Sequence, residues 1–170
     1  HSWSFGVSGR SERTGQPFAA FAFTGGGSGA TAGYDGWDSI GTPVTMGGMR
    51  AADVEIHERG APCTVIRHEY EIDSGGAGEW RGGLGSVTFW RVDQDDLRVV
   101  CYGSGGIEAS APFGLGGGAA ARPSWARIHY ADDRAEPVLI NTIVKLNRGD
   151  VVEIHTAGGG GFGDPLRRDA

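Results

Sequence analysis

The sequence predicts a mainly β domain, sandwich- or barrel-like, with roughly six to eight strands, glycine-rich loops and little helix. Three observations favour this class. Several short runs are apolar or alternate apolar and polar side chains, as half-buried strands do. Clusters of glycine separate these runs. No segment carries a long apolar stripe with the 3.6-residue period of a helix, and the best helical candidate, residues 46–59, is weakened by Gly47 and Gly48.

We expect a strand in each of seven segments. The alternation is clearest in residues 63–73, where Thr64, Ile66 and His68 fall on one face. The segments are residues 16–24, 63–73, 86–92, 97–102, 126–130, 138–146 and 151–155.

Two connections between expected strands are polar and short. Residues 93–96 form a link of hairpin length between the third and fourth expected strands. Residues 148–150 predict a turn before the last strand.

The chain has 170 residues, of which 32 are glycine and 7 proline, a composition that approaches low-complexity disorder. Disorder is nevertheless disfavoured, because the sequence contains 5 Trp, 7 Phe and 4 Tyr and is 39% hydrophobic. The glycines have no three-residue period, which excludes collagen. The length suits one domain, residues 1–170.

Charge and hydropathy exclude two classes of partner. The net charge of −6 argues against nucleic acid and anionic membranes, both of which favour a basic surface. No apolar run approaches the length of a membrane span, and no signal peptide is recognisable. Cys63 and Cys101 have no metal-binding or redox spacing, so we expect reduced core cysteines in a cytoplasmic protein.

The glycines gather in five clusters, which predict backbone at positive φ or backbone that a ligand or another chain approaches closely. A phosphate-binding loop is disfavoured. Gly158, Gly160 and Gly163 match G-x-G-x-x-G, but Asp164 and Pro165 follow at once, so no helix can begin there. We therefore expect no nucleotide cofactor on this chain. The clusters are residues 25–29, 75–78, 82–85, 114–118 and 158–163.

Two loops carry candidate polar contacts. Asp35 and Asp38 flank Trp37, an arrangement that indicates either a substrate loop or an Asx turn beside a packed tryptophan. Arg81 can clamp a carboxylate or phosphate. Alternatively, it pairs with Glu79 or Asp73 and holds its own loop.

A third candidate is the segment that begins at Asp53. If it were a strand, Asp53, Glu55 and His57 would share one face and could bind a metal, although a solvated edge is the more ordinary interpretation. His129 and His155 lie in strand-like runs, where we expect structural, hydrogen-bonded histidines.

The order of the glycine-containing motifs closely resembles the C-terminal part of the hydantoinase B/oxoprolinase family. The family includes B subunits of N-methylhydantoinases, the matching half of 5-oxoprolinase, and subunits of acetone and acetophenone carboxylases. The motifs are GGGSGATAGYDGW (25–37), DVEIHERGAP (53–62), DSGGAGEWRGGLG (73–85), PFGLGGG (112–118) and GDVVEIHTAGGGGFGDPLRRD (149–169).

The resemblance implies a component of an ATP-dependent complex. A hydantoinase A-type subunit would use ATP to phosphorylate a carbonyl or amide oxygen, and the B component would promote attack on the activated carbon. The partners implied are that subunit, the remainder of the B subunit and a small-molecule substrate. The family's divalent metal lies in an upstream part that this chain does not match, so no metal ligand is assigned to His57 or His68. A chain that opens at His1 suits either a fragment of a B subunit or a naturally split small subunit.

Three functions follow as hypotheses. The first is ATP-dependent opening of a cyclic amide of the hydantoin or 5-oxoproline type. The second is ATP-dependent carboxylation of a ketone, and the third is a non-catalytic assembly module whose glycine loops lie against partner chains. The catalytic residues are unknown, and the candidate contact residues are Asp35, Asp53, Glu55, Glu58 and Arg81.

Overall fold

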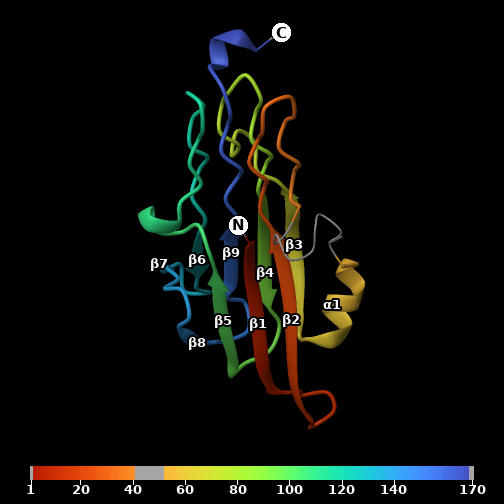
Figure 1. The fold of residues 1–170 in the computed structure, drawn as a ribbon. Helices are drawn as coiled ribbons and strands as arrows, with labels where there is room; N and C mark the ends of the chain where they lie inside the picture. The colour runs from red at the N-terminus through yellow and green to blue at the C-terminus, as the bar shows by residue number, and fades with distance from the viewer. Residues whose placement is uncertain (1, 41–51, 169–170) are drawn as a thin grey trace.

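The computed structural model describes residues 2–40 and 52–168, which form a sandwich of two antiparallel sheets (Figure 1). The first sheet has the order β2-β1-β5-β8 and the second has the order β3-β4-β9-β6-β7. The first comprises β1 (Ser2–Arg10), β2 (Pro17–Gly25), β5 (Leu97–Gly103) and β8 (Ile143–Leu146). The second comprises β3 (Cys63–Tyr70), β4 (Ser86–Val92), β6 (Trp125–His129), β7 (Ala135–Pro137) and β9 (Val151–His155). The mainly β prediction is confirmed, with nine strands in the described residues.

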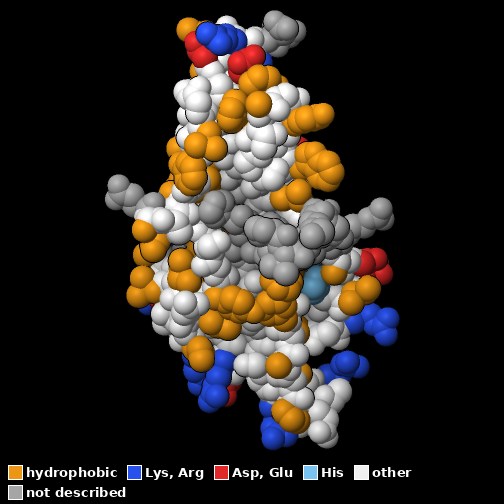
Figure 2. All heavy atoms as spheres, viewed as in Figure 1, with side chains coloured by type: hydrophobic (Ala, Val, Ile, Leu, Met, Phe, Trp, Pro, Cys, Tyr) orange, Lys and Arg blue, Asp and Glu red, His pale blue; other side chains and the backbone are white. Residues whose placement is uncertain are grey.

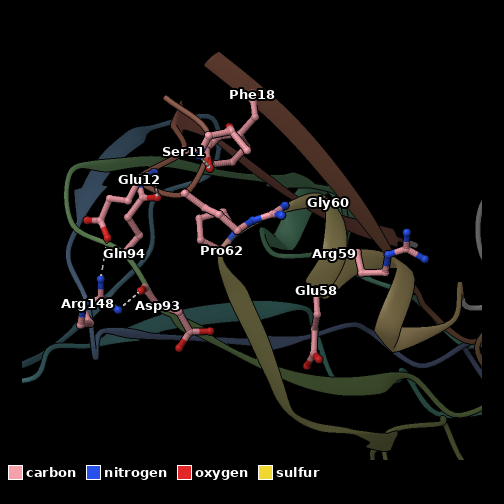
Figure 3. Close-up of a pocket in the computed structure, with 13 residues that line it drawn as sticks. Ser11, Glu12, Phe18, Glu58, Arg59, Gly60, Pro62, Asp93, Gln94 and Arg148 are labelled. Atoms are coloured by element: carbon pink, nitrogen blue, oxygen red, sulfur yellow. Dashed lines mark hydrogen bonds and ion pairs between the residues drawn. The ribbon is translucent and has the colours of Figure 1, made fainter. Parts of the chain in front are cut away.

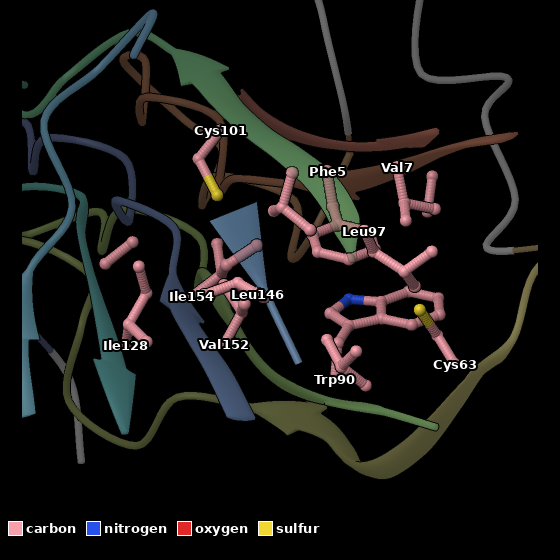
Figure 4. Packing of buried hydrophobic residues seen from close by; sticks show 14 of the residues in the cluster. Phe5, Val7, Cys63, Trp90, Leu97, Cys101, Ile128, Leu146, Val152 and Ile154 are labelled. Carbon is pink, nitrogen blue, oxygen red and sulfur yellow. The ribbon is translucent and has the colours of Figure 1, made fainter. Parts of the chain in front are cut away.

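Alternating side chains build the core between the sheets. On β1, Trp3, Phe5 and Val7 point inward and are almost fully buried. Phe5 stacks on Trp90 of β4, with ring centroids 5.0 Å apart and planes 5° apart, so one aromatic pair joins the two sheets (Figure 4). Cys63 and Cys101 are unpaired and buried in this core, as expected.

Helix α1 (Val54–Gly60) overlaps the second half of the best helical candidate, residues 46–59. The part of that candidate before residue 52 lies outside the described residues. Asp53 caps the helix, because its carboxylate accepts a hydrogen bond of 3.0 Å from the N–H of Glu55. The strand interpretation of this segment is therefore wrong. In the helix, Asp53, Glu55 and His57 do not share a strand face. Two further turns are 3₁₀-helical: η2 (Glu108–Ser110) and η3 (Pro165–Arg167).

Two connections differ from the expected topology. Residues 93–96 do not close a hairpin, since β4 and β5 belong to opposite sheets. Asp96 has a φ of 60° at this crossover, and Val92 pairs with Cys63 of β3 instead. The expected strand at 138–146 is shortened to β8, because a turn around Asn141, with a φ of 62°, interrupts its first half.

The glycine clusters form a separate layer of structure beyond one end of the sandwich. We call it the glycine bundle and define it as residues 25–38, 73–85, 112–121 and 157–163. In Figure 1 these segments run side by side away from the strands, with the C-terminal segment at the far end. Residues 156–161 are all buried by the other segments, whose white backbone and orange apolar side chains form the narrow upper part of the molecule in Figure 2.

Hydrogen bonds between main chains hold the glycine bundle together. The N–H of Gly159 donates to the carbonyl of Gly83, and that of Gly161 donates to the carbonyl of Ala119, each over 2.9 Å. Positions 158 and 161 face the same neighbouring segment, at Ser74 and Ala77, whereas position 160 faces Phe113. A three-residue period is that of an extended polyproline II-type chain rather than of a β-strand.

Close packing of backbones explains why the clusters are glycine. A Cβ at Gly159 would overlap the carbonyl group of Ser28, and one at Gly160 would overlap that of Phe113. Positive φ is needed at few cluster positions; among those described, only Gly116, Gly117 and Gly163 have it. The backbone approach that the sequence predicted is thus made by the chain itself rather than by a ligand or another chain.

Candidate functional site

An open groove of about 520 Å³ lies at the outer end of the glycine bundle, and Asp35 is one of the charged residues that line it. The carboxylate of Asp35 accepts a hydrogen bond of 2.7 Å from the backbone N–H of Arg81. It also accepts two hydrogen bonds of 2.7 Å from the guanidinium of Arg168. These donors, with the bidentate Arg168 bond first, outweigh partial burial and lower the pKa of Asp35 to about 2. Groove residues are Gly33, Tyr34, Asp35, Glu79, Trp80, Arg167 and Arg168.

The structure thus brings together two of the sequence candidates, Asp35 and Arg81, but through the Arg81 backbone. No ion pair of the Arg81 guanidinium is recorded within residues 2–40 and 52–168, so neither Glu79 nor Asp73 holds it there. Arg168 was not among the candidates. Its partner is 133 residues away in sequence, and no local pattern signals such a pair.

The loop around Trp37 braces the bundle. Asp38 accepts a hydrogen bond of 2.7 Å from the N–H of Leu84, and the N–H of Trp37 donates to the Ser28 hydroxyl over 2.7 Å. Trp37 itself is 66% exposed, so it is not the packed tryptophan of the ordinary interpretation. The two aspartates fix loop 81–84, and the indole is presented to the outside.

The remaining candidates lie on and before α1, and none of them lines the groove of Asp35. Asp53 is the helix cap, and Glu58 accepts a hydrogen bond of 3.0 Å from the N–H of Val65. Glu55 is exposed. His57 faces the Trp90 ring edge-on at 5.6 Å rather than a metal ligand set. The five candidates therefore do not converge on one site.

Glu58 lines a second, larger groove of about 860 Å³ near the β1–β2 turn (Figure 3). Arg148 crosses it by an ion pair of 2.8 Å to Glu12. Gln94 is 5% exposed and bridges the backbone at both sides, since it donates to the Arg10 carbonyl and accepts from the Glu12 N–H, each over 2.8 Å. Arg148, Glu12 and Gln94 are thus engaged with one another or with nearby backbone.

A chain of titratable side chains crosses the outer face of the second sheet. His129 Nε2 lies 2.6 Å from Glu153 Oε2, and His155 Nε2 lies 2.9 Å from Glu153 Oε1. Burial alone would raise the pKa of Glu153, but the hydrogen bonds from the two histidines outweigh burial and lower it. The expectation that His129 and His155 are hydrogen-bonded is confirmed.

A metal ion has no matching ligand set in the part of the chain that the structure describes. There, no group of three or more His, Cys, Asp and Glu side chains is arranged to hold one. The residues present do not fit the divalent metal that the family resemblance implies.

A nucleotide phosphate does not fit the last glycine cluster either. The N–H groups of Gly159, Gly161 and Gly163 already donate to main-chain carbonyls over 2.9 Å, so they cannot cradle an anion. Among the described residues no helix is long and apolar enough to cross a membrane.

The fold and its bundle define a β-sandwich domain that also occurs within much longer proteins. Its structure is similar to acetone carboxylase in the nucleotide-free state, with a TM-score of 0.83 and 24% identity over 99% of this chain and 26% of that one. It is also similar to the ATP-dependent caprolactamase of Pseudomonas jessenii, with a TM-score of 0.76 and 28% identity over 97% of this chain and 29% of that one.

Sequence comparison identifies the family. Residues 1–165 match the hydantoinase B/oxoprolinase family, and the chain belongs to it. The beta subunit of caprolactamase from Pseudomonas jessenii is 32% identical over 144 residues, which are 84% of this chain and 25% of that subunit. The chain spans a quarter or less of the length of this subunit and of two further curated relatives that it matches.

Proposed function

We propose that this chain is a framework domain in the hydantoinase B-like component of an ATP-dependent complex that opens cyclic amides. One observation carries the proposal: the match to the hydantoinase B/oxoprolinase family over residues 1–165 includes 32% identity to a caprolactamase beta subunit. A cyclic amide is a poor electrophile. Phosphorylation of its oxygen by ATP supplies a good leaving group, so that water can complete the ring opening with release of ADP and phosphate.

The internal bonding of the candidate residues supports a framework role. Asp35, Asp53 and Glu58 each accept hydrogen bonds from this chain's own backbone, and Asp35 is also held by Arg168. Glu55 and Arg81 are exposed and remain our candidates for contact with a substrate or a neighbouring chain. In this proposal the reacting groups and the metal come from other parts of the complex.

The proposal includes partners and a compartment. ATP binds to a hydantoinase A-type subunit, and the remainder of the B component completes the site. We keep the cytoplasmic location as part of the proposal, since both cysteines are unpaired and buried.

The test is a substrate panel on the purified complex that contains this chain. Caprolactam, 5-oxoproline and hydantoin are each incubated with and without ATP, and ring opening and ADP release are measured together. The proposal expects ring opening of at least one cyclic amide, coupled to ADP release and absent without ATP. Absence of ATP-coupled opening of every ring in an assembled complex would overturn it.

Ketone carboxylation is the second candidate, because the fold is also that of acetone carboxylase. An assay with acetone and bicarbonate distinguishes ketone carboxylation from cyclic-amide hydrolysis. ATP turnover that requires bicarbonate and yields acetoacetate favours carboxylation, whereas turnover on a lactam without bicarbonate favours hydrolysis.

A further inference from the structure

The outward side chains of the first sheet form an exposed apolar surface. We call it the apolar face and define it as Phe21 and Phe23 of β2, Val100 and Tyr102 of β5, and Ile143 of β8. The strand registers place all five on the side of the sheet away from the core. Phe21, Phe23 and Ile143 are 40%, 45% and 67% exposed. A group of large apolar side chains exposed together usually marks a contact site.

The aromatic rings of the apolar face meet across β1, because the outward residues of β1 beneath them are small. Ser4 lies between Phe23 and Tyr102, and it is only 3% exposed although it faces outward. Phe21 stacks on Tyr102 with ring centroids 5.4 Å apart, and it meets Phe23 edge-on at 4.5 Å. The rings therefore form one continuous surface above β1 rather than isolated exposed side chains.

Charge on this side of the sheet is confined to one end. Arg98 and Lys145 lie opposite each other there, and Arg10 ends β1. Lys145 lies 2.6 Å from Asp96 in a largely exposed pair. Within the described strands of this sheet, no outward residue is aspartate or glutamate. Figure 2 shows orange side chains across the middle of the sandwich and blue ones toward the end away from the glycine bundle. The surface is thus apolar at its centre and cationic at its rim.

The outer face of the second sheet is different, because its charged groups are paired within the chain. Arg67 forms an ion pair with Glu69, and Glu153 is hydrogen-bonded to both His129 and His155. These polar groups need no partner from outside. The apolar face instead exposes hydrocarbon to water, and burial against another surface would remove that cost.

Strand β2 is also unusual for the edge of a sheet. It is the outermost described strand of the first sheet, and residues 17–25 contain no charged side chain and no bulge. Exposed edge strands usually carry charges, prolines or bulges that discourage pairing with another chain, and here only Pro17 at the start is of that kind. This indicates that the β2 side of the sheet is covered in the assembled protein.

The comparisons indicate which chain is available to cover it. The domain spans 26% and 29% of the two similar solved chains, so most of each of those chains lies outside it. Ser2 at the start of β1 lies opposite Gly25, and Trp3 lies opposite Gly103. This end of the chain is therefore between the strand ends that carry Phe23 and Tyr102. In a longer chain that continues from this end, the added residues start beside the apolar face.

We propose that the apolar face is the surface on which the remainder of the hydantoinase B-like component packs. The proposal rests on the proposed function, which makes the chain a part of that component. The chemistry of the face defines its partner: a surface with apolar side chains opposite Phe21 and Ile143 and with carboxylates opposite Arg98. A second copy of this chain fits less well, because two apolar faces in contact would bring cationic rims together without any carboxylate between them.

Photo-cross-linking within the assembled complex tests the proposal without ATP or substrate. A benzophenone side chain replaces Phe23 in one sample and Ile143 in another, and cross-linked peptides are identified by mass spectrometry. We expect both labels to react with residues of the B component outside residues 1–170. A benzophenone in place of Phe89, on the outer face of the second sheet, is the matched control and should not give that product.

The proposal is overturned if the labels react only with a second copy of this chain, with the ATP-using subunit or with other parts of this chain. It is also overturned if an assembled complex gives no product, or if the Phe89 label gives as much of the expected product as the Phe23 label. A complex that opens no cyclic amide can still give the expected cross-links, and an active complex can fail to give them. The outcome is therefore distinct from that of the cyclic-amide assay.

A charge reversal tests the predicted chemistry of the partner. Arg98→Glu should lower the yield of cross-links from the Ile143 label about threefold at low salt, as expected for the loss of one exposed ion pair, and by less at high salt. Arg127→Glu, at an exposed position on the outer face of the second sheet, is the control and should leave the yield unchanged. An unchanged or increased yield in Arg98→Glu would overturn the assignment of carboxylates to the partner. If Arg98→Glu does not assemble, the two labels in the otherwise unmodified complex decide alone.

Discussion

The carbonyl group of Ser28 lies where the Cβ of any residue other than glycine at position 159 would have to be. The two residues come from opposite ends of the chain, and the contact is main chain against main chain. It explains the unusual glycine content: the clusters allow neighbouring segments to approach until their backbones touch.

Gly159→Ala should therefore destabilise the fold by at least about 3 kcal/mol, the upper part of the usual range for overpacking, because the obstacle is backbone and cannot rotate away. Thermal or denaturant unfolding measures it. Gly60→Ala is the matched control. Its added Cβ meets nothing within 4 Å and its φ is not positive, so we expect a change of less than about 1 kcal/mol. Equal effects of the two variants would contradict the packing account.

Asp35→Asn should cost about 1 kcal/mol or less at neutral pH, because the pair with Arg168 is 42% and 41% exposed and is screened by solvent. The pKa of Asp35 is lowered to about 2, so its contribution is fully present above its ordinary value of 3.8 and is lost as the pH falls through 2. Melting temperatures of the two proteins should converge as the pH is lowered over that interval. A difference in melting temperature that stays constant to pH 2 would exclude the ion pair as its cause. Arg167→Ala, a change at the neighbouring arginine, is the control and should leave the dependence of the melting temperature on pH unaltered.

Asp150→Asn should destabilise the turn before β9 by about 1–3 kcal/mol. Asp150 is 5% exposed, and its two oxygens accept from the N–H groups of Ala131 and Asn147 over 2.9 and 2.8 Å. Asparagine has one acceptor oxygen, so its amide nitrogen would face an N–H donor. Denaturant unfolding checks this. Asp133→Asn, at an exposed position with a φ of 68° that asparagine tolerates, should be nearly neutral.

Neither cysteine should react with a thiol reagent in the folded protein at pH 8. Burial raises the pKa of Cys63 to about 12, with a further contribution from Asp93, and burial raises the pKa of Cys101 to about 12. The reactive thiolate is therefore scarce and shielded. Labelling should begin only as denaturant unfolds the chain, in step with loss of secondary structure. Rapid labelling of the native protein would contradict the core placement of the two thiols.

Local patterns predicted much of the fold. The strand at 86–92 was predicted with its observed bounds, because it is a short, largely apolar run between a glycine cluster and a polar connection. Strand β1 was not among the expected strands, although Trp3, Phe5 and Val7 alternate there with serine and glycine. The connection at residues 93–96 was predicted to be a hairpin because its length and polarity are those of one. It is a crossover between the sheets instead, because β5 pairs with β1 of the first sheet, and a local pattern cannot show that pairing.

The candidate site was less predictable. Asp35 and Arg81 could be selected by residue type, but the partner of Asp35 is Arg168, which only the folded glycine bundle brings near. The proximity of Glu71 and His155 has the same origin: Glu71 follows β3 and His155 ends β9, and only the folded sheet brings the two side chains near each other. The glycine clusters were expected to face a ligand or partner, and a sequence cannot tell such backbone from backbone that packs on itself.

The central claim is that this chain is a framework for an ATP-dependent complex whose reacting groups lie elsewhere. The most direct measurement is ATP-coupled turnover per assembled complex for Asp35→Asn, Glu55→Gln and Arg81→Ala, with assembly quantified for each. We expect turnover within about threefold of that of the unmodified complex, since removal of a group that acts in the transition state lowers turnover by a much larger factor. A loss of a hundredfold or more in a fully assembled variant would contradict the claim and assign that residue to catalysis.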